Sequence, residues 1–267
     1  MVSVREMRWD RDLSGRHIFL CKVLFVSLLL LSMSGCSQFI LGYKNIGVFI
    51  DWKVSGYLKQ TTEDKKILAQ SIDGVVRWHH ETMLIKYANF LDQQVLLFER
   101  SRIDRYQVLN ALKTIQDLFE ETLEGVTPFI AKVLVRHTSE SKILFLEERL
   151  REVTIESSRE LKVNKDLDKI RLEEITVNFE RFFGRLNQAQ LSQIKFYIRS
   201  TRDSQYYWHK RRIKRHERFV NFLRQRPSEI QLEMFVLKHF SIKNRDKDTE
   251  EWWSHFSALI IGMFSTI

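Results

Sequence analysis

Apolar residues recur at steps of three and four positions along most of the chain, a period that is typical of amphipathic helices. The clearest run starts after the capping candidates Thr61 and Thr62 and continues to about Phe98. Other helical runs are predicted near 48–58, over 101–125, from 127, from 138, and over 166–183, 187–226, 227–240 and 249 onward. No stretch of useful length alternates apolar and polar residues as a strand does. We therefore predict an all-α fold, an irregular bundle of about seven or eight helices.

Several helix ends are predicted from local signals. The segment Ser101 to Asp104 resembles a capping box, Gly125 is a helix stop, and Pro128 suits the first turn of a new helix. Gly184 is a second stop, and Asn187 is a good N-cap for the helix after it. These signals predict separate helices on either side of Gly125 and one long helix from Asn187 to about position 226.

The first part of the chain has the three parts of a secretory signal. A basic region is followed by nine uncharged residues over 23–31 and by a stretch of small residues over 32–37. The residues Met33, Ser34, Gly35 and Cys36 are similar to the bacterial lipobox, which implies cleavage between Gly35 and Cys36 and a lipid on the Cys36 thiol. We accordingly expect a signal peptide over 1–35, a lipidated N-terminus, tether and short helix over 36–60, and an all-α domain over 61–267.

The alternative is an uncleaved membrane helix, because Val23 to Tyr43 is 21 residues long and carries no charge. Small and polar residues dilute its second half, which favours the lipoprotein. In both interpretations Arg16 and Lys22 keep the N-terminus in the cytoplasm and place the later residues outside it. By resemblance to Gram-negative lipoproteins, Ser37 after the cysteine favours the outer membrane, facing the periplasm.

Composition excludes several kinds of protein. The chain has 267 residues and a formal net charge of +9, with only 9 Gly, 2 Pro and 2 Cys. Two cysteines cannot form a disulfide framework or a cysteine-rich metal site, and the shortage of glycine argues against a phosphate-binding loop. His79 and His80 are adjacent, so their rings point about 100° apart on a helix and cannot share one metal. We expect neither a cofactor nor a metal.

Short motifs spread over the mature chain together resemble an uncharacterised family of helical bacterial envelope lipoproteins, a family whose domain has no known function. They are the lipobox ending in Gly35-Cys36-Ser37, Tyr43-Lys44-Asn45, Asp51-Trp52, Trp78-His79-His80, Pro128, the segment 182–190, and the helix around Arg211, Arg215 and Phe219. The family has no assigned activity, so the resemblance implies a helical fold and a location, not a reaction.

Basic residues dominate positions 209–226, where eight lysines and arginines stand against Glu217 alone. A charge run on a helix is often only a solvated face. The functional interpretation is an anion-binding stripe with Arg211, Arg212 and Arg215 at its centre. Outside the cytoplasm its partner would be an anionic envelope component, a lipid head group, lipopolysaccharide or peptidoglycan, and not nucleic acid.

Two further features have more than one interpretation. His209 and His216 are seven positions apart on an apolar seam, which predicts either histidines bonded to carboxylates of a neighbouring helix or a pH-sensing pair. The apolar tail, 256–267, is too short to span a membrane and is interpreted as a core helix or, with Trp252 and Trp253, as a second membrane contact.

We predict a non-enzymatic binding protein of the cell envelope, because the chain has no nucleophile elbow, no Gly-x-Gly loop and no His-Glu-x-x-His helix. One alternative is a chaperone-like or envelope-stress module, since Leu186 to Gln190 is similar to an element of small periplasmic stress chaperones. The other is a cell-wall lyase, whose Glu-Ser dipeptide occurs at Glu140-Ser141 and Glu156-Ser157 but lacks the residues that follow it in such enzymes.

Overall fold

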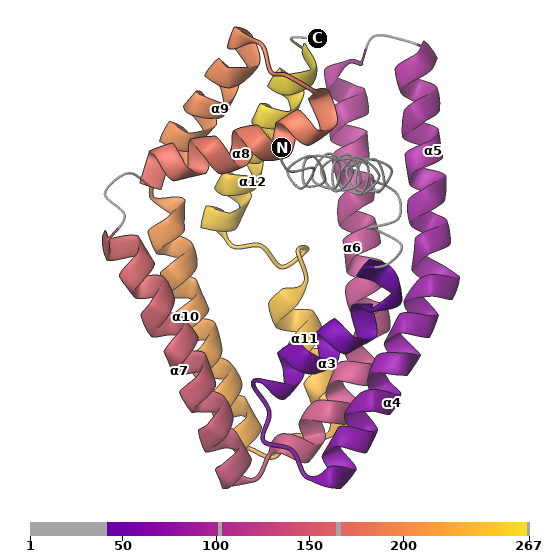
Figure 1. Cartoon of the computed structure of the whole chain (residues 1–267), viewed down its shortest axis with the longest axis vertical. Coiled ribbons are helices and arrows are strands. Elements are labelled where there is room, and N and C mark those ends of the chain that lie inside the picture. The colour runs from indigo at the N-terminus through magenta and orange to yellow at the C-terminus, as the bar shows by residue number, and fades with distance from the viewer. Residues whose placement is uncertain (1–41, 101–102, 164–166, 266–267) are drawn as a thin grey trace, which may run out of the picture. The chain divides into compact units, whose positions relative to one another are not determined.

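The computed structural model describes residues 42–100, 103–163 and 167–265. They belong to two units, one ending at Phe49 and one starting at Ile50. The regular structure of these residues is entirely helical (Figure 1), which confirms the all-α prediction, but the count of seven or eight helices was too low. The ten α-helices of these ranges are α3 (Ile46–Ser55), α4 (Thr62–Trp78), α5 (Leu84–Arg100), α6 (Arg105–Leu134), α7 (Glu140–Val163), α8 (Leu167–Phe183), α9 (Gln188–Ser200), α10 (Ser204–Arg224), α11 (Glu229–Phe240) and α12 (Lys247–Ser265). A π-helical turn, His79–Met83, joins α4 to α5, and a 3-10 turn, Val135–His137, follows α6.

The predicted break at Gly125 is wrong, because α6 runs without interruption through Pro128. Proline has no amide hydrogen for the carbonyl of Glu124, a loss that ordinarily breaks a helix. Thr127 is buried in the same turn, and its hydroxyl donates to the carbonyl of Leu123 (2.6 Å). Since α6 packs along both α4 and α11, tertiary contacts here outweigh the local preference to stop.

The single helix predicted from Asn187 to about 226 is in fact two, α9 and α10, separated at Thr201 to Asp203. The guanidinium of Arg171, on α8, donates to the carbonyls of Ile198 and Thr201 (both 3.3 Å) and to the Thr201 hydroxyl (2.7 Å). Arg171 therefore satisfies carbonyls that a continuing helix would have used, and α9 ends there.

Other helix ends follow the sequence more closely. Thr61 and Asn187 form capping boxes with Asp64 and Gln190, as their side chains predict. Gly184 adopts φ +68°, a left-handed conformation that ends α8. The N-cap of α6 is Asp104, and not the first residue of the predicted capping box. The last helix, α12, starts at Lys247 and not at Thr249, whose amide donates to the side chain of Asp246.

The apolar core consists of two clusters. The first joins residues of α4, α6, α7, α10 and α11 and includes Leu68, Leu146 and Leu223. The second joins α9 and α12 with the segment before α9, and includes Ile194 and Met263. The C-terminal helix thus buries Leu259 and Met263 in a core, as one of the two interpretations of the tail expected. Among the described residues, no helix combines the length and the apolar character that a membrane crossing requires.

Two glycines bring α4 and α6 unusually close together. A Cβ atom on Gly125 would lie 1.9 Å from the ring of Trp78, and one on Gly74 would lie 2.5 Å from the ring of Phe129. Each aromatic ring therefore occupies the space that a side chain would need on the facing helix. This contact fixes the spacing of the two helices next to the cavity described below.

Candidate functional site: an apolar cavity

A cavity of about 560 Å³ lies among the helices of the first core cluster. Its lining comes from α3, α4, α6, α7 and α10 and from the segment between α3 and α4, and the surface it exposes to the cavity is apolar. A volume of roughly 300–1,000 Å³ with a mostly apolar wall is typical of small-molecule sites. The space is partly open to solvent, and its size and apolar wall make it a binding-site candidate. Lining side chains include Val54, Ile72, Phe129, Leu146 and Phe219.

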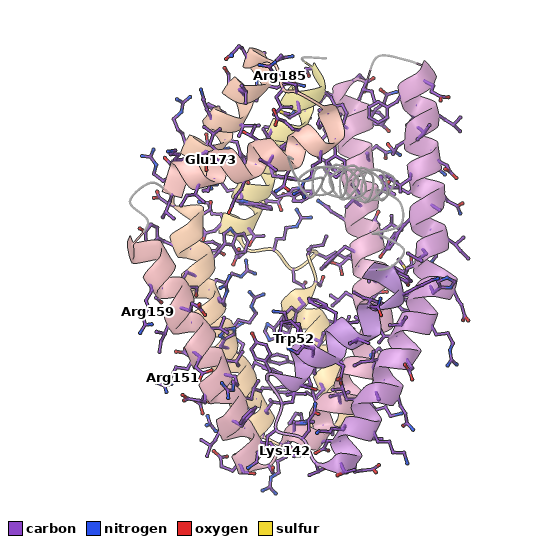
Figure 2. All side chains as sticks on the ribbon, viewed as in Figure 1. Trp52, Lys142, Arg151, Arg159, Glu173 and Arg185 are labelled. Atoms are coloured by element: carbon purple, nitrogen blue, oxygen red, sulfur yellow. The ribbon has the colours of Figure 1, made fainter. Side chains whose placement is uncertain are left out.

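A buried carboxylate holds together three elements beside the cavity. Asp64, whose side chain is 1% exposed, lies one turn before the lining residue Leu68. It accepts a hydrogen bond from Nε of Arg136 (3.0 Å), an ion-paired contact from Lys142 and the amide hydrogen of Thr61 (2.9 Å). Burial opposes the charge of Asp64, but these donors together lower its pKa well below the ordinary range. The carboxylate thus ties α4 to the end of α6 and the start of α7, where Figure 2 shows Lys142.

His137 is buried beside this ion cluster. Its Nδ1 lies 2.8 Å from the carbonyl of Val133, and its Nε2 is buried without a hydrogen-bond partner. Burial lowers the pKa of His137, which favours the neutral ring with its proton on Nδ1. The neutral form is the one that this enclosed position can hold next to the cations Lys142 and Arg136.

Ser71 is the one position on the inner face of α4 that breaks an otherwise apolar wall. It lies among Leu68, Ile72 and Val75, all of which line the cavity, and it is 4% exposed. Its hydroxyl oxygen is buried and has no hydrogen-bond partner. The surface of the cavity includes no polar area, so this hydroxyl oxygen is covered by neighbouring atoms and does not face the cavity.

Lys53 is the charged member of the lining. It is an exposed residue of α3, and its ammonium group lies over the ring of Trp52, 4.9 Å from the ring centre. Trp52, labelled in Figure 2, is itself 65% exposed. A lysine with an apolar stem against the cavity and its charge near solvent marks a polar edge of the site.

The residues predicted from the N-terminal motif, Met33, Ser34, Gly35 and Cys36, lie outside the described residues. The predicted anion-binding arginines are on α10, and all three are half-buried. Arg211 pairs with Asp246 (3.2 Å), and Arg215 lies over the ring of Phe240, 5.4 Å from its centre. Burial, together with the neighbouring charges of Arg211 and Arg212, lowers the pKa of Arg215. The three side chains therefore do not form one exposed stripe.

The exposed basic residues of α10 are not the three predicted arginines. Lys210, Lys214, Arg218 and Arg224 are exposed, and Arg224 is paired with Glu147 (2.6 Å) on the adjacent α7. The basic run is thus divided between side chains that contact neighbouring helices and side chains that face solvent.

The two histidines of α10 contact hydroxyls of α7, not the carboxylates that one interpretation expected. Nε2 of His209 lies 2.9 Å from Oγ of Ser158, and Nδ1 of His216 lies 3.4 Å from Oγ1 of Thr154. α7 and α10 run side by side (Figure 1), so these pairs cross the interface between them. Burial and the nearby charges of Arg215 and Arg212 lower the pKa of His216. His216 can therefore bond as a neutral ring.

His79 and His80 lie in the π-helical turn. The ring of His79 meets the ring of Tyr87 edge-on, with 5.6 Å between ring centres. In the portion of the chain that the structure describes, no group of three or more histidine, cysteine, aspartate or glutamate side chains is arranged to hold a metal ion.

Sequence patterns did not reveal the cavity, because apolar periodicity marks which residues face inward and not how well they fill the interior.

A family model described as a family of unknown function (DUF6279) matches residues 56–248. No curated protein and no solved structure matches the chain significantly. The matched range contains most of the cavity lining, including all of its residues from α4, α6, α7 and α10.

Proposed function

The chain belongs to the DUF6279 family of unknown function, and from this premise we propose that it is a lipid-anchored, non-enzymatic binding protein of the bacterial cell envelope. Its ligand site is the apolar cavity. The observation that carries this proposal is a space of about 560 Å³, partly open to solvent, with an apolar wall. Binding, rather than catalysis, accounts for a wall of this composition.

Native mass spectrometry tests the ligand site directly. The full chain is isolated from envelopes of its native host, and the mass of any small molecule bound to it is measured. Val75→Phe places a larger side chain in the cavity wall, whereas Val177→Phe makes the same change at a position that is 50% exposed on α8. We expect a bound molecule on the wild type and on Val177→Phe and none on Val75→Phe. A cavity that is empty in all three proteins would contradict the proposal.

The membrane anchor is supported by the sequence from Met33 to Cys36, and its test is independent of the cavity. Cells are labelled with radioactive palmitate, and the protein is separated on a denaturing gel, which removes any lipid that is not covalently bound. The wild type is expected to carry label and Cys36→Ala to carry none. Equal labelling of both proteins, or an intact N-terminal segment in the wild type, would contradict the anchor.

Anion binding by α10 remains part of the proposal, with its exposed cations as the contact points. Lys210 and Lys214 are exposed and can be changed to glutamate without removing the Arg211–Asp246 pair. Vesicles with anionic head groups should sediment the unlipidated Cys36→Ser chain at low salt, and the double change to glutamate should reduce this severalfold. Unchanged sedimentation would contradict the prediction.

The chaperone-like alternative has one specific observation in its favour. On α5 the large apolar residues Ile85, Leu91, Val95 and Phe98 are each at least half exposed. Contiguous exposed apolar surface marks an interaction site in many soluble proteins. Suppression of the aggregation of an unfolded client would support this alternative, particularly if Leu91→Gln with Val95→Gln abolished it.

The cell-wall lyase is the weaker alternative. Glu140 is exposed and lies 3.5 Å from Nε of Arg224, and Glu156 is exposed on α7. Neither side chain is enclosed in an apolar pocket of the kind that a catalytic acid occupies. We expect purified peptidoglycan to keep its turbidity in the presence of the protein, and clearing would contradict the non-enzymatic proposal.

A further inference from the structure

We infer that the groove between α10 and α11 binds an acidic amphipathic helix of a partner protein, whose apolar face covers the floor of the groove and whose carboxylates pair with Lys214, Arg218 and Lys238. The groove shares no lining residue with the apolar cavity. The inference therefore goes beyond the proposed ligand site and does not depend on it.

The groove is a space of about 990 Å³, open to solvent, between two helices that the short segment 225–228 joins. Its lining residues run from Lys214 to Gln225 on α10 and from Gln231 to His239 on α11. At about 1.5 Å for each residue, the wall that α10 provides is about 16 Å long, which corresponds to roughly three turns of a bound helix. An open space at the upper end of the size range of small-molecule sites suits a peptide segment better than an enclosed metabolite.

The floor of the groove is apolar and partly aromatic. Phe222 of α10 stacks on Phe235 of α11, with 4.3 Å between ring centres and 11° between the ring planes. Met234 also lines the groove and is 65% exposed. Covering these side chains removes apolar surface from water, and the flexible methionine adapts to the shape of a partner. The floor therefore favours a partner with an apolar face.

Three cations line the end of the groove that is farther from the turn between the helices. Lys214 and Arg218 of α10 and Lys238 of α11 are all exposed, and the surface of the groove is part polar and part apolar. A guanidinium nitrogen of Arg218 lies 3.4 Å from Nδ1 of His239, so this cation reaches from α10 to α11. Among the described residues, no carboxylate lies within ion-pair distance of the three cations, and Glu217 is the one acid in the lining. The excess of positive charge selects a partner with acidic side chains.

The walls of the groove favour a helical partner over an extended one. Both walls are helices, which bond their backbone groups internally, so the groove offers no strand edge for an extended peptide to pair with. A peptide in this groove must satisfy its own backbone hydrogen bonds, as a helix does. An amphipathic helix places apolar residues on one face and acidic residues beside them, which matches an apolar floor with a basic end.

Fluorescence anisotropy with a synthetic peptide tests this inference. The probe is a labelled helix of about 14 residues with leucines along one face and glutamates along the other. The full chain is held in nanodiscs of zwitterionic lipid, and empty nanodiscs serve as the blank. We expect saturable binding of this acidic peptide by the wild type. A second peptide, with glutamine in place of each glutamate, should bind at least about tenfold more weakly.

Variants of the protein locate the binding surface. Arg218→Glu with Lys238→Glu should weaken binding of the acidic peptide at least about tenfold. The matched control, Lys113→Glu with Lys195→Glu, makes the same change in net charge at two exposed lysines outside the groove, and its affinity should stay within about twofold of the wild type. Met234→Gln should weaken binding severalfold without loss of helicity, because this side chain is largely exposed.

Several results would overturn the inference. Equal affinity of the wild type for the glutamate and glutamine peptides would remove the role of the acids, and this comparison needs no substitution in the protein. Equal losses in the two double variants would show attraction by net charge alone, and no saturation below about 1 mM peptide would show that no site exists. Displacement of the peptide by phosphatidylglycerol vesicles at lower concentration than by unlabelled peptide would assign the cations to a membrane surface. In each case the cavity would remain a separate question, because its own test uses Val75→Phe.

Discussion

Replacing Asp64 by asparagine should destabilise the protein strongly, although the change preserves the size of the side chain. The carboxylate is 1% exposed and is shared by Arg136 and Lys142, whose side chains are 38% and 15% exposed. Removing one partner of a buried ion pair costs about 3–5 kcal/mol, and the partial exposure of the two cations favours the lower end, about 3 kcal/mol. At roughly 2–4 °C of melting temperature for each kcal/mol in a chain of this size, the midpoint should fall by roughly 6–12 °C.

Thermal unfolding followed by circular dichroism measures this loss, with Glu148→Gln as the matched control. Glu148 pairs with Arg151, and both side chains are largely exposed, at 49% and 62%. Figure 2 shows Arg151 on α7, and a solvent-exposed pair of this kind is screened by water and salt. The control should therefore melt with the wild type. A melting temperature of Asp64→Asn within 2 °C of the wild-type value is roughly what a cost below 1 kcal/mol would give. That result would refute the argument that this buried carboxylate stabilises the fold.

The difference in stability between the wild type and Asp64→Asn should depend on pH, which provides a second test of the same reasoning. The pKa of Asp64 is lowered in the folded state, so its contribution is complete above the pKa of an unfolded aspartate, about 3.9, and is lost as the pH falls below that value. The gap in unfolding free energy between the wild type and Asp64→Asn should be constant from pH 7 to pH 5 and shrink toward pH 3. A gap that widened on acidification would contradict the direction of the shift.

Three further predictions concern other parts of the fold. Glu120 is buried and accepts the amide hydrogens of Ile242 and Lys243 and the hydroxyl hydrogen of Ser241. It should protect the two amides, so Glu120→Gln is expected to speed their hydrogen exchange roughly tenfold, as measured by mass spectrometry. Gly125→Ala should lower stability by about 1–3 kcal/mol, because the new methyl group overlaps the ring of Trp78, and a rise in the melting temperature would contradict the close helix contact. The pKa of His216 is lowered in the folded state, so the unfolded chain binds the proton first and stability falls from pH 7 to pH 5. In chemical denaturation at the two pH values, His216→Gln should show a smaller fall, and an equal fall would place the proton uptake elsewhere.

The sequence predicted those helix ends that depend on a single local signal. Thr61 and Asn187 cap their own helices, and Gly184 supplies its own left-handed conformation, so each signal needs no knowledge of the rest of the chain. The ends that it missed are determined by distant residues. Arg171 ends α9 from a neighbouring helix, and the packing of α6 carries that helix through Pro128.

The cavity shows the same division between local pattern and tertiary arrangement. Apolar spacing correctly placed Ile72 and Val75 on an inward face, but only the relative positions of the surrounding helices determine that the interior between them is not filled. The predicted arginines were identified from the length of a charge run. The neighbours that half-bury Arg211 and Arg215, including Asp246 and Phe240, come from later segments that a charge count does not take into account.

The π-helical turn His79–Met83 determines how α5 faces α6. Its hydrogen bonds close over five residues instead of four, so it holds one residue more than an α-helical turn, and each residue turns the helix by about 100°. Beyond it, Lys86 pairs with Glu121, and the hydroxyl of Tyr87 lies 2.6 Å from that of Thr122. Deleting a single residue between Trp78 and Leu84 would restore a regular helix and rotate both contacts away from their partners. The number of residues in this short segment therefore sets the rotation of α5 about its own axis, so an insertion or deletion there would turn every side chain of that helix.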